Sequence, residues 1–343
     1  MTAAAQTLMF SEAAEAAKVV ARQREENRAT IADLSDRLRR EPPRVVSTCA
    51  RGSSDHAATF AKYLIETSLG VPVTSIAPSV ASIYKTSPRS ADTLLLAISQ
   101  SGRSPDLLSA AKAAREGGSQ IVALVNDASS PLAALADTTL PLRAGAERSV
   151  AATKSYIASL AASLDLVSAW AQDADLSSAL VAAPELLAAS WDCDWSALVE
   201  GLVDAQGLYV IGRGFGLGIA QEAALKFKET CGLHAEAFSA AEVRHGPMAL
   251  IGPNLPVLLF RQEDETATGV DELAVAALAQ GATVYCVGAA VQGAISLASI
   301  SAAPAIQPML QIQSFYRALN ALSLARGFHP DAPANLRKVT ETL

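Results

Sequence analysis

The sequence predicts an α/β fold with two lobes, each a parallel sheet covered by helices in a flavodoxin-like three-layer α/β/α arrangement. Apolar runs alternate with helical stretches along most of the chain, as in parallel α/β sheets. A strand, an Arg-Gly pair and an Ala-rich helix occur twice, with the pairs at 51 and 213, which indicates an internal repeat. The 343 residues, 50% of them hydrophobic, are enough for two cores.

The first lobe follows a helical arm. Residues 1–40 lack Pro and Gly and are expected to be helical until Pro42 and Pro43 end the helix. The run 93–99 is almost entirely apolar, which is typical of a strand buried on both faces. The elements expected here are strands at 44–50, 71–77, 93–99 and 120–125, a helix that follows the polar loop 51–55 and extends to about 68, and a helix from near 106 to 117.

A helical region, 153–205, is expected to link the lobes, with breaks near Asp173 and Pro184. The strand pattern then restarts at 207–211, followed by a Gly-rich loop, a helix, and strands at 256–260 and 283–287. These elements predict an arm at 1–40, a first domain at 41–190, and a second domain with a C-terminal tail at 191–343.

Composition excludes several classes of function. A formal net charge of -7 argues against nucleic acid as a partner. No apolar run approaches the ~20 residues that span a bilayer, and the N-terminus has no signal-peptide pattern. The cysteines are scattered and form no CxxC pair, so we expect no metal site, no redox dithiol and no cofactor, and thiols kept reduced in the cytoplasm. These cysteines are Cys49, Cys193, Cys231 and Cys286.

A Ser-rich loop follows the most apolar strand. Ser99, Gln100, Ser101 and Ser104 stand at a strand's carboxyl end and just before a helix, which is where open parallel sheets bind ligands. Hydroxyls and the N–H groups at a helix start suit a phosphate monoester. The alternative is an ordinary N-capping turn. The Gly-Ser-Ser at 52–54 ends a neighbouring strand and offers further donors.

The Gly-rich loop 212–216 does not fit a dinucleotide fingerprint, because Leu217 stands where GxGxxG needs its last Gly. We expect it to make a tight turn from strand to helix.

The helix after this loop carries Glu222, Lys226 and Glu229, spaced by four and three residues, so all three share one face. Apolar neighbours favour a half-buried stripe able to transfer protons, and the alternative is a solvated salt-bridge stripe. His245 precedes Gly246-Pro247, a rigid turn that presents the imidazole, although a single His is more often structural.

Together these segments resemble the sugar isomerase (SIS) family, and within it the isomerase half of glucosamine-6-phosphate synthases and the free-standing SIS-type glucosamine-6-phosphate deaminases. The resemblance extends from about residue 44 to the C-terminus. The matching segments are GSSDH (52–56), SQSGRS (99–104), VAATKS (150–155), EAALKFKETCGLHAEAF (222–238), EVRHGP (242–247) and NLRKVT (335–340).

The resemblance implies a homodimer with shared active sites and a role for each motif. It implies phosphate binding by Ser54, Ser99, Gln100, Ser101 and Ser104, and sugar contacts at Ser53, Val150, Ala151 and Thr153. Glu229 would move a proton between C1 and C2 of the open-chain sugar, flanked by Glu222 and Lys226. His245 of the partner subunit would assist ring opening, and Lys338 would stabilise the enediol oxygen or the leaving amine.

The resemblance further implies that the ligand is a hexose phosphate, with an aminosugar phosphate favoured. The chain begins at the isomerase half and its first cysteine is Cys49, so we expect no glutaminase activity. The expected reaction converts glucosamine 6-phosphate to fructose 6-phosphate and ammonia. The alternatives are another ketose- or aldose-phosphate isomerase, a sugar-amine phosphate deglycase, and a non-catalytic sugar-phosphate sensor.

Overall fold

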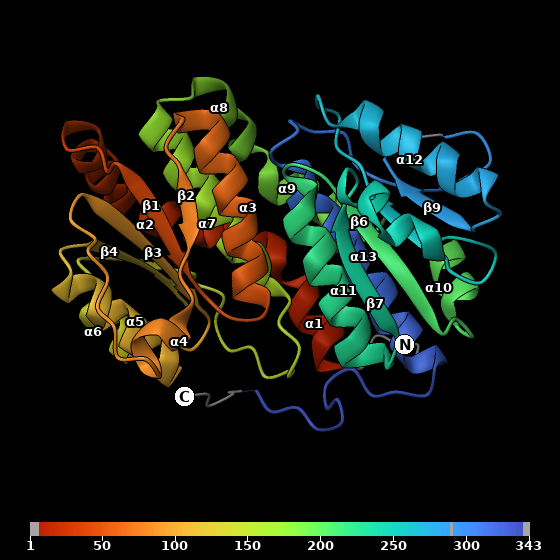
Figure 1. Cartoon of the computed structure of the whole chain (residues 1–343), viewed down its shortest axis with the longest axis horizontal. Helices are drawn as coiled ribbons and strands as arrows, with labels where there is room; N and C mark the ends of the chain where they lie inside the picture. The colour runs from red at the N-terminus through yellow and green to blue at the C-terminus, as the bar shows by residue number, and fades with distance from the viewer. Residues whose placement is uncertain (1–6, 289–290, 339–343) are drawn as a thin grey trace. The chain divides into compact units, whose positions relative to one another are not determined.

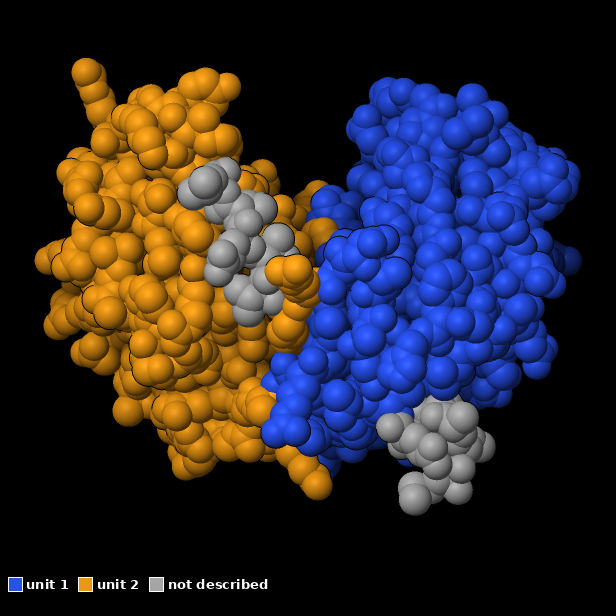
Figure 2. Space-filling view, turned by 90° about the horizontal axis from the view of Figure 1, so that it is seen from below, with its two compact units in different colours: residues 1–17, 147–154, 182–336 blue, residues 18–146, 155–181, 337–343 orange. Residues whose placement is uncertain are grey.

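Two parallel five-stranded sheets form the cores of the protein in the computed structural model, which describes residues 7–288 and 291–338 (Figure 1). Each sheet belongs to its own compact unit. Figure 2 shows the two units in different colours. Unit 1 comprises residues 1–17, 147–154 and 182–336, and unit 2 comprises residues 18–146, 155–181 and 337–343. The arm predicted at 1–40 is divided between the two units at residue 17, and position 190 lies within the 182–336 stretch of unit 1.

Unit 2 contains the first sheet, in the order β2-β1-β3-β4-β5. Its strands are β1 (Val45–Cys49), β2 (Val73–Ser75), β3 (Thr93–Ser99), β4 (Gln120–Val125) and β5 (Thr138–Pro141). Its helices are α2 (Ala16–Arg40), α3 (Ser53–Leu69), α4 (Pro78–Ser82), α5 (Pro105–Glu116), α6 (Pro131–Leu135), α7 (Lys154–Ala171) and α8 (Ala174–Val181).

Unit 1 contains the second sheet, in the order β10-β9-β8-β6-β7. Its strands are β6 (Gly207–Gly212), β7 (His234–Ser239), β8 (Val257–Phe260), β9 (Val284–Val287) and β10 (Ile295–Leu297). Its helices are α1 (Leu8–Ala14), α9 (Ala183–Trp191), α10 (Ser196–Leu202), α11 (Gly216–Cys231), η2 (Glu242–His245), η3 (Pro247–Leu250), α12 (Ala267–Ala279) and α13 (Gln307–Ala325).

Both faces of the first sheet are buried, which explains its continuous apolar strands. Leu95 of β3 and Ile121 of β4 pack with α5 residues such as Leu107 on one face. The alternate residues Leu94 and Leu96 point to the other face and are also buried. A strand buried on both faces needs apolar side chains at every position, and β3 and β4 have the bounds that the sequence predicts.

The order of the first sheet creates a topological switch point between β1 and β3. From β1 the chain passes to β2 on one side and then to β3 on the other, with all pairings parallel. Connections leave these strands in opposite directions, so a crevice is expected outside their carboxyl ends. The segment after β1 contains Ser53 and Ser54, and the segment after β3 contains Gln100 and Ser101.

Candidate active site

The predicted phosphate loop has a defined backbone conformation. Gly102 has a φ of 62°, and a Cβ built there would lie 2.3 Å from Ser130 Oγ and 2.9 Å from Val125 Cγ2. The loop therefore requires Gly102 both for its φ and for the space. Ser99 Oγ accepts a hydrogen bond from Gly102 N at 3.0 Å, and Ser101 Oγ accepts one from Arg103 N at 3.3 Å.

Exposure separates the roles that the loop hydroxyls can play. Ser99 is 7% exposed and bonded within the loop, so its side chain maintains the loop conformation. Gln100, Ser101 and Ser104 are partly exposed. Ser104 precedes α5 without a side-chain capping bond, and Pro105 occupies the first helical position. The N–H groups and hydroxyls at this helix start suit an anion.

An ion pair joins the two Ser-containing segments of unit 2. Arg51, which follows β1, donates from Nε to Asp106 Oδ2 at 2.8 Å, and Asp106 lies in the first turn of α5. The Asp106 side chain is 1% exposed and also accepts Leu107 N at 2.8 Å. This pair fixes the segment that carries Ser53 and Ser54 relative to the start of α5.

On α11, the predicted acid–base stripe forms a connected line of charges. Lys226 Nζ lies 3.3 Å from Glu222 Oε1 and donates to Glu229 Oε2 at 2.6 Å. The side chains of Glu222 and Lys226 are 0% and 1% exposed, whereas that of Glu229 is 20% exposed. Of the three side chains, only that of Glu229 meets solvent, so only its carboxylate is open to a ligand.

The charge state of Lys226 is set by its two carboxylate partners. Burial by itself would lower the pKa of the Lys226 ammonium, because it removes the charge from water. Glu222 and Glu229 more than offset this effect, and the pKa of Lys226 is raised above its ordinary value. The buried Tyr316 of α13 donates its O–H to Glu222 Oε1 at 3.1 Å. The line therefore holds a permanent cation beside Glu229.

Two further predicted residues are accessible to solvent. His245 ends η2 and is exposed, and Gly246 beyond it has a φ of 146°. Lys338 is partly exposed and belongs by its contacts to unit 2. Residues 339 and 340 of the NLRKVT motif lie outside the described residues.

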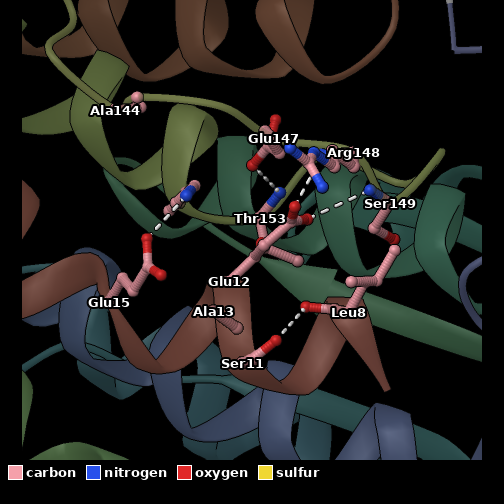
Figure 3. A network of polar contacts seen from close by, with 12 residues as sticks. Leu8, Ser11, Glu12, Ala13, Glu15, Ala144, Glu147, Arg148, Ser149 and Thr153 are labelled. Atoms are coloured by element: carbon pink, nitrogen blue, oxygen red, sulfur yellow. Dashed lines mark hydrogen bonds and ion pairs between the residues drawn. The ribbon is translucent and has the colours of Figure 1, made fainter.

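The predicted sugar-contact segment is part of unit 1. Val150 is partly exposed, whereas Ala151 is 1% and Thr153 0% exposed. Contact with a ligand through the last two would therefore involve their backbone atoms. A network of carboxylates surrounds this segment (Figure 3).

Neither a metal cluster nor a membrane span is found in the described parts of the chain. There, no three or more His, Cys, Asp or Glu side chains are grouped so as to hold a metal ion. The described helices are too short or too polar to cross a bilayer.

The chain matches the SIS domain twice, over residues 43–169 and over residues 201–324. The chain belongs to the SIS domain family. The two matched stretches contain the two parallel sheets, so the repeat of this SIS protein predicted from its Arg-Gly pairs is confirmed.

Among curated relatives, the SIS protein is 32% identical over 314 residues to a glutamine–fructose-6-phosphate aminotransferase (isomerizing) from Leifsonia xyli subsp. xyli. This match covers 85% of the chain and 51% of the relative. The chain thus spans about half the length of the curated relatives it matches.

Two solved structures show the same fold. A candidate phosphosugar isomerase from Silicibacter pomeroyi DSS-3 is 41% identical, with a TM-score of 0.91 over 95% of this chain and 100% of that chain. The C-terminal domain of glucosamine-fructose-6-phosphate aminotransferase from Francisella tularensis is 23% identical, with a TM-score of 0.87 over 96% of this chain and 98% of that chain.

Three side chains that support these sites were not predicted from the sequence. Arg51 and Asp106 are 55 positions apart, and Tyr316 lies 94 positions from Glu222. The position of Arg51 directly after the first strand is a signal that could have singled it out. Nothing in the local sequence distinguishes Tyr316 from an ordinary apolar residue of α13.

Proposed function

We propose that this SIS protein acts on a hexose phosphate, and that it converts glucosamine 6-phosphate and water to fructose 6-phosphate and ammonia. The observation that carries the proposal is the α11 line, in which one partly exposed carboxylate, Glu229, is paired with a buried cation. The names of the Leifsonia xyli relative and the Silicibacter pomeroyi protein support a sugar-phosphate substrate.

In the proposed mechanism, the Ser-rich loop binds the phosphate while Glu229 works at the other end of the open-chain sugar. Glu229 removes the proton from C2 of the aldehyde form, and the electron pair of that C–H bond forms a C1–C2 double bond. The π electrons of the C1 carbonyl move onto its oxygen, which takes up a proton. A proton returned to C1 gives the ketimine at C2. Water then adds to C2, ammonia leaves, and the ketone of fructose 6-phosphate remains.

The charges around Glu229 fit this role. A base that serves two adjacent carbons must stay in one position through both transfers, and the 2.6 Å bond to Lys226 restrains it. The buried ammonium of Lys226 lies beside the Glu229 carboxylate throughout, so the acid–base group and a cation are held together. We propose that Lys338 stabilises the developing enolate oxygen or the leaving amine.

We further propose that the protein is a homodimer and that His245 assists ring opening in the partner's site. Its exposure at the end of η2 supports a role outside its own core. Mixing Glu229→Gln with His245→Ala subunits tests this proposal. Random pairing should then restore about one quarter of the wild-type activity. Two inactive variants that remain inactive after mixing and reassociation would contradict it.

Product analysis tests the function itself. The purified protein is incubated separately with glucosamine 6-phosphate, fructose 6-phosphate, tagatose 6-phosphate and a fructosamine 6-phosphate, and products and ammonia are quantified. The proposal expects ammonia and fructose 6-phosphate in equal amounts from the first substrate. Turnover of another substrate in its place would identify a different isomerase or a deglycase. Binding without turnover of any of them would identify a sensor.

A further inference from the structure

One buried carboxylate of α1 holds two consecutive backbone N–H groups of the segment 147–154 (Figure 3). Glu12 Oε1 accepts Arg148 N at 2.6 Å, and Glu12 Oε2 accepts Ser149 N at 3.1 Å. Glu12 is 6% exposed, so its carboxylate is largely shielded from bulk water. Charge-assisted bonds of this kind are about twice as strong as neutral ones.

Two further backbone bonds restrain the same segment within unit 1, and a side-chain ion pair lies at its end. Glu147 Oε1 accepts Thr153 N at 3.0 Å, which closes the segment on itself. Lys154 Nζ donates to Glu15 Oε2 at 2.6 Å. Val150 N donates to the carbonyl of Asp331 at 3.4 Å. Four backbone N–H groups in this short segment therefore have carboxylate or carbonyl acceptors, and two of those four bonds depend on Glu12.

Helix α1 is itself firmly anchored, so Glu12 has a fixed position from which to act. The Asp331 carboxylate accepts Leu8 N at 2.8 Å and Met9 N at 2.7 Å, which satisfies two N–H groups of the first turn of α1. Gln313 of α13 donates to the carbonyl of Ala13 at 3.0 Å. Asp331 thus contacts both α1, through its side chain, and Val150, through its carbonyl.

We infer that Glu12 is a positioning residue for sugar binding: its carboxylate fixes the backbone of segment 147–154, which presents Val150 and Ala151 to the hexose. This inference rests on the proposed function and deepens it. Because Ala151 and Thr153 are buried, the position of the main chain decides what the segment offers to a ligand. A displacement of about 1 Å at such a contact can cost two orders of magnitude in rate.

The variant Glu12→Gln tests this role. Its amide replaces one acceptor oxygen by an NH₂ group, which cannot accept the Arg148 or Ser149 N–H that it then faces. We expect the Kd and KM for glucosamine 6-phosphate to rise about tenfold, the effect of losing one charge-assisted bond. The inhibition constant and Kd of inorganic phosphate should stay within twofold, because phosphate probes the Ser-rich loop without the sugar.

Glu15→Gln is the matched control on the same helix. It removes the ion pair to Lys154 but no bond to the backbone of the segment. The Kd of glucosamine 6-phosphate and the Kd of inorganic phosphate should therefore both stay within twofold of their wild-type values. Glu12→Asp keeps the charge with a shorter side chain and should give an intermediate Kd. Glu12→Asp also provides the comparison if Glu12→Gln fails to fold.

Calorimetric binding separates this inference from the proposed function. A wild-type protein that binds glucosamine 6-phosphate without turning it over would end the deaminase proposal but leave the Glu12 comparison intact. Equal weakening of glucosamine 6-phosphate and inorganic phosphate in the Glu12 variants would overturn the inference, as would no weakening of either. The inference would also be overturned if the wild-type protein bound glucosamine 6-phosphate no more tightly than inorganic phosphate.

Discussion

Lys226 Nζ lies 2.6 Å from Glu229 Oε2, and the two side chains are 1% and 20% exposed. The bond joins a cation that has no access to water with a carboxylate that does. Glu222, at 0% exposure, balances the charge of Lys226 from the other side. The line therefore carries one excess negative charge, which lies at the accessible end.

The first prediction concerns the buried end of this line. Lys226→Met leaves Glu222 buried without its cation, and we expect the free energy of unfolding to fall by about 3–5 kcal/mol. The double variant Glu222→Gln/Lys226→Met removes both charges, and the Gln oxygen still accepts from Tyr316. It should therefore recover most of the loss. Urea denaturation of the wild type, both single variants and the double variant measures the coupling. A double variant no more stable than Lys226→Met would contradict the charge-pairing account.

The second prediction concerns the phosphate loop. Gly102→Ala places a Cβ 2.3 Å from Ser130 Oγ, so the loop must move, and we expect the Kd of inorganic phosphate to rise about tenfold or more. Gly327→Ala is the control, because Gly327 has a φ of 79° and nothing lies within 4 Å of the position that a Cβ would take there. In both variants the new Cβ stands at a positive φ, which costs about 1–2 kcal/mol of backbone strain. Only Gly102→Ala should weaken phosphate, as measured by calorimetry, and equal affinities would show that phosphate binds elsewhere.

The third prediction concerns stability at alkaline pH. Burial raises the pKa of the Cys286 thiol from 9.0 to about 11, with a smaller contribution from Asp271. The folded state therefore holds this proton more tightly than the unfolded state, and its stabilising effect is lost as the pH rises through this window. We expect Cys286→Ala to reduce the slope of unfolding free energy against pH by about 1.4 kcal/mol per pH unit between pH 9 and 11. Denaturation curves at several pH values measure the slope, and an unchanged slope in the variant would show that this thiol does not contribute.

How far the fold could be predicted depends on how each strand is buried. Strands β3 and β4 lie inside the first sheet, and their apolar runs show their bounds. Strand β7 lies at the edge of the second sheet and contains exposed His234 and Glu236, so no apolar run reveals it. The edge strands β5 and β10 are also short, and they were not predicted from the sequence.

In the candidate site, too, contacts within one helix could be predicted from the sequence, whereas contacts between residues far apart in the chain could not. The stripe of Glu222, Lys226 and Glu229 could be predicted because helical spacing alone brings these residues together. The bond from Glu12 to Arg148 joins residues 136 positions apart, and tertiary packing creates it. Hydrophobic periodicity indicates which face of a helix is buried, but it does not indicate which distant residue contacts that face.

The most direct test of the proposed chemistry is ammonia release from glucosamine 6-phosphate by the wild type, by Glu229→Gln and by Glu185→Gln, whose glutamate is exposed on α9. We predict that Glu229→Gln lowers kcat by roughly 10²–10⁴-fold, the usual contribution of a general acid–base, while Glu185→Gln matches the wild type. A Glu229→Gln variant that releases ammonia at the wild-type rate would show that another group moves the proton.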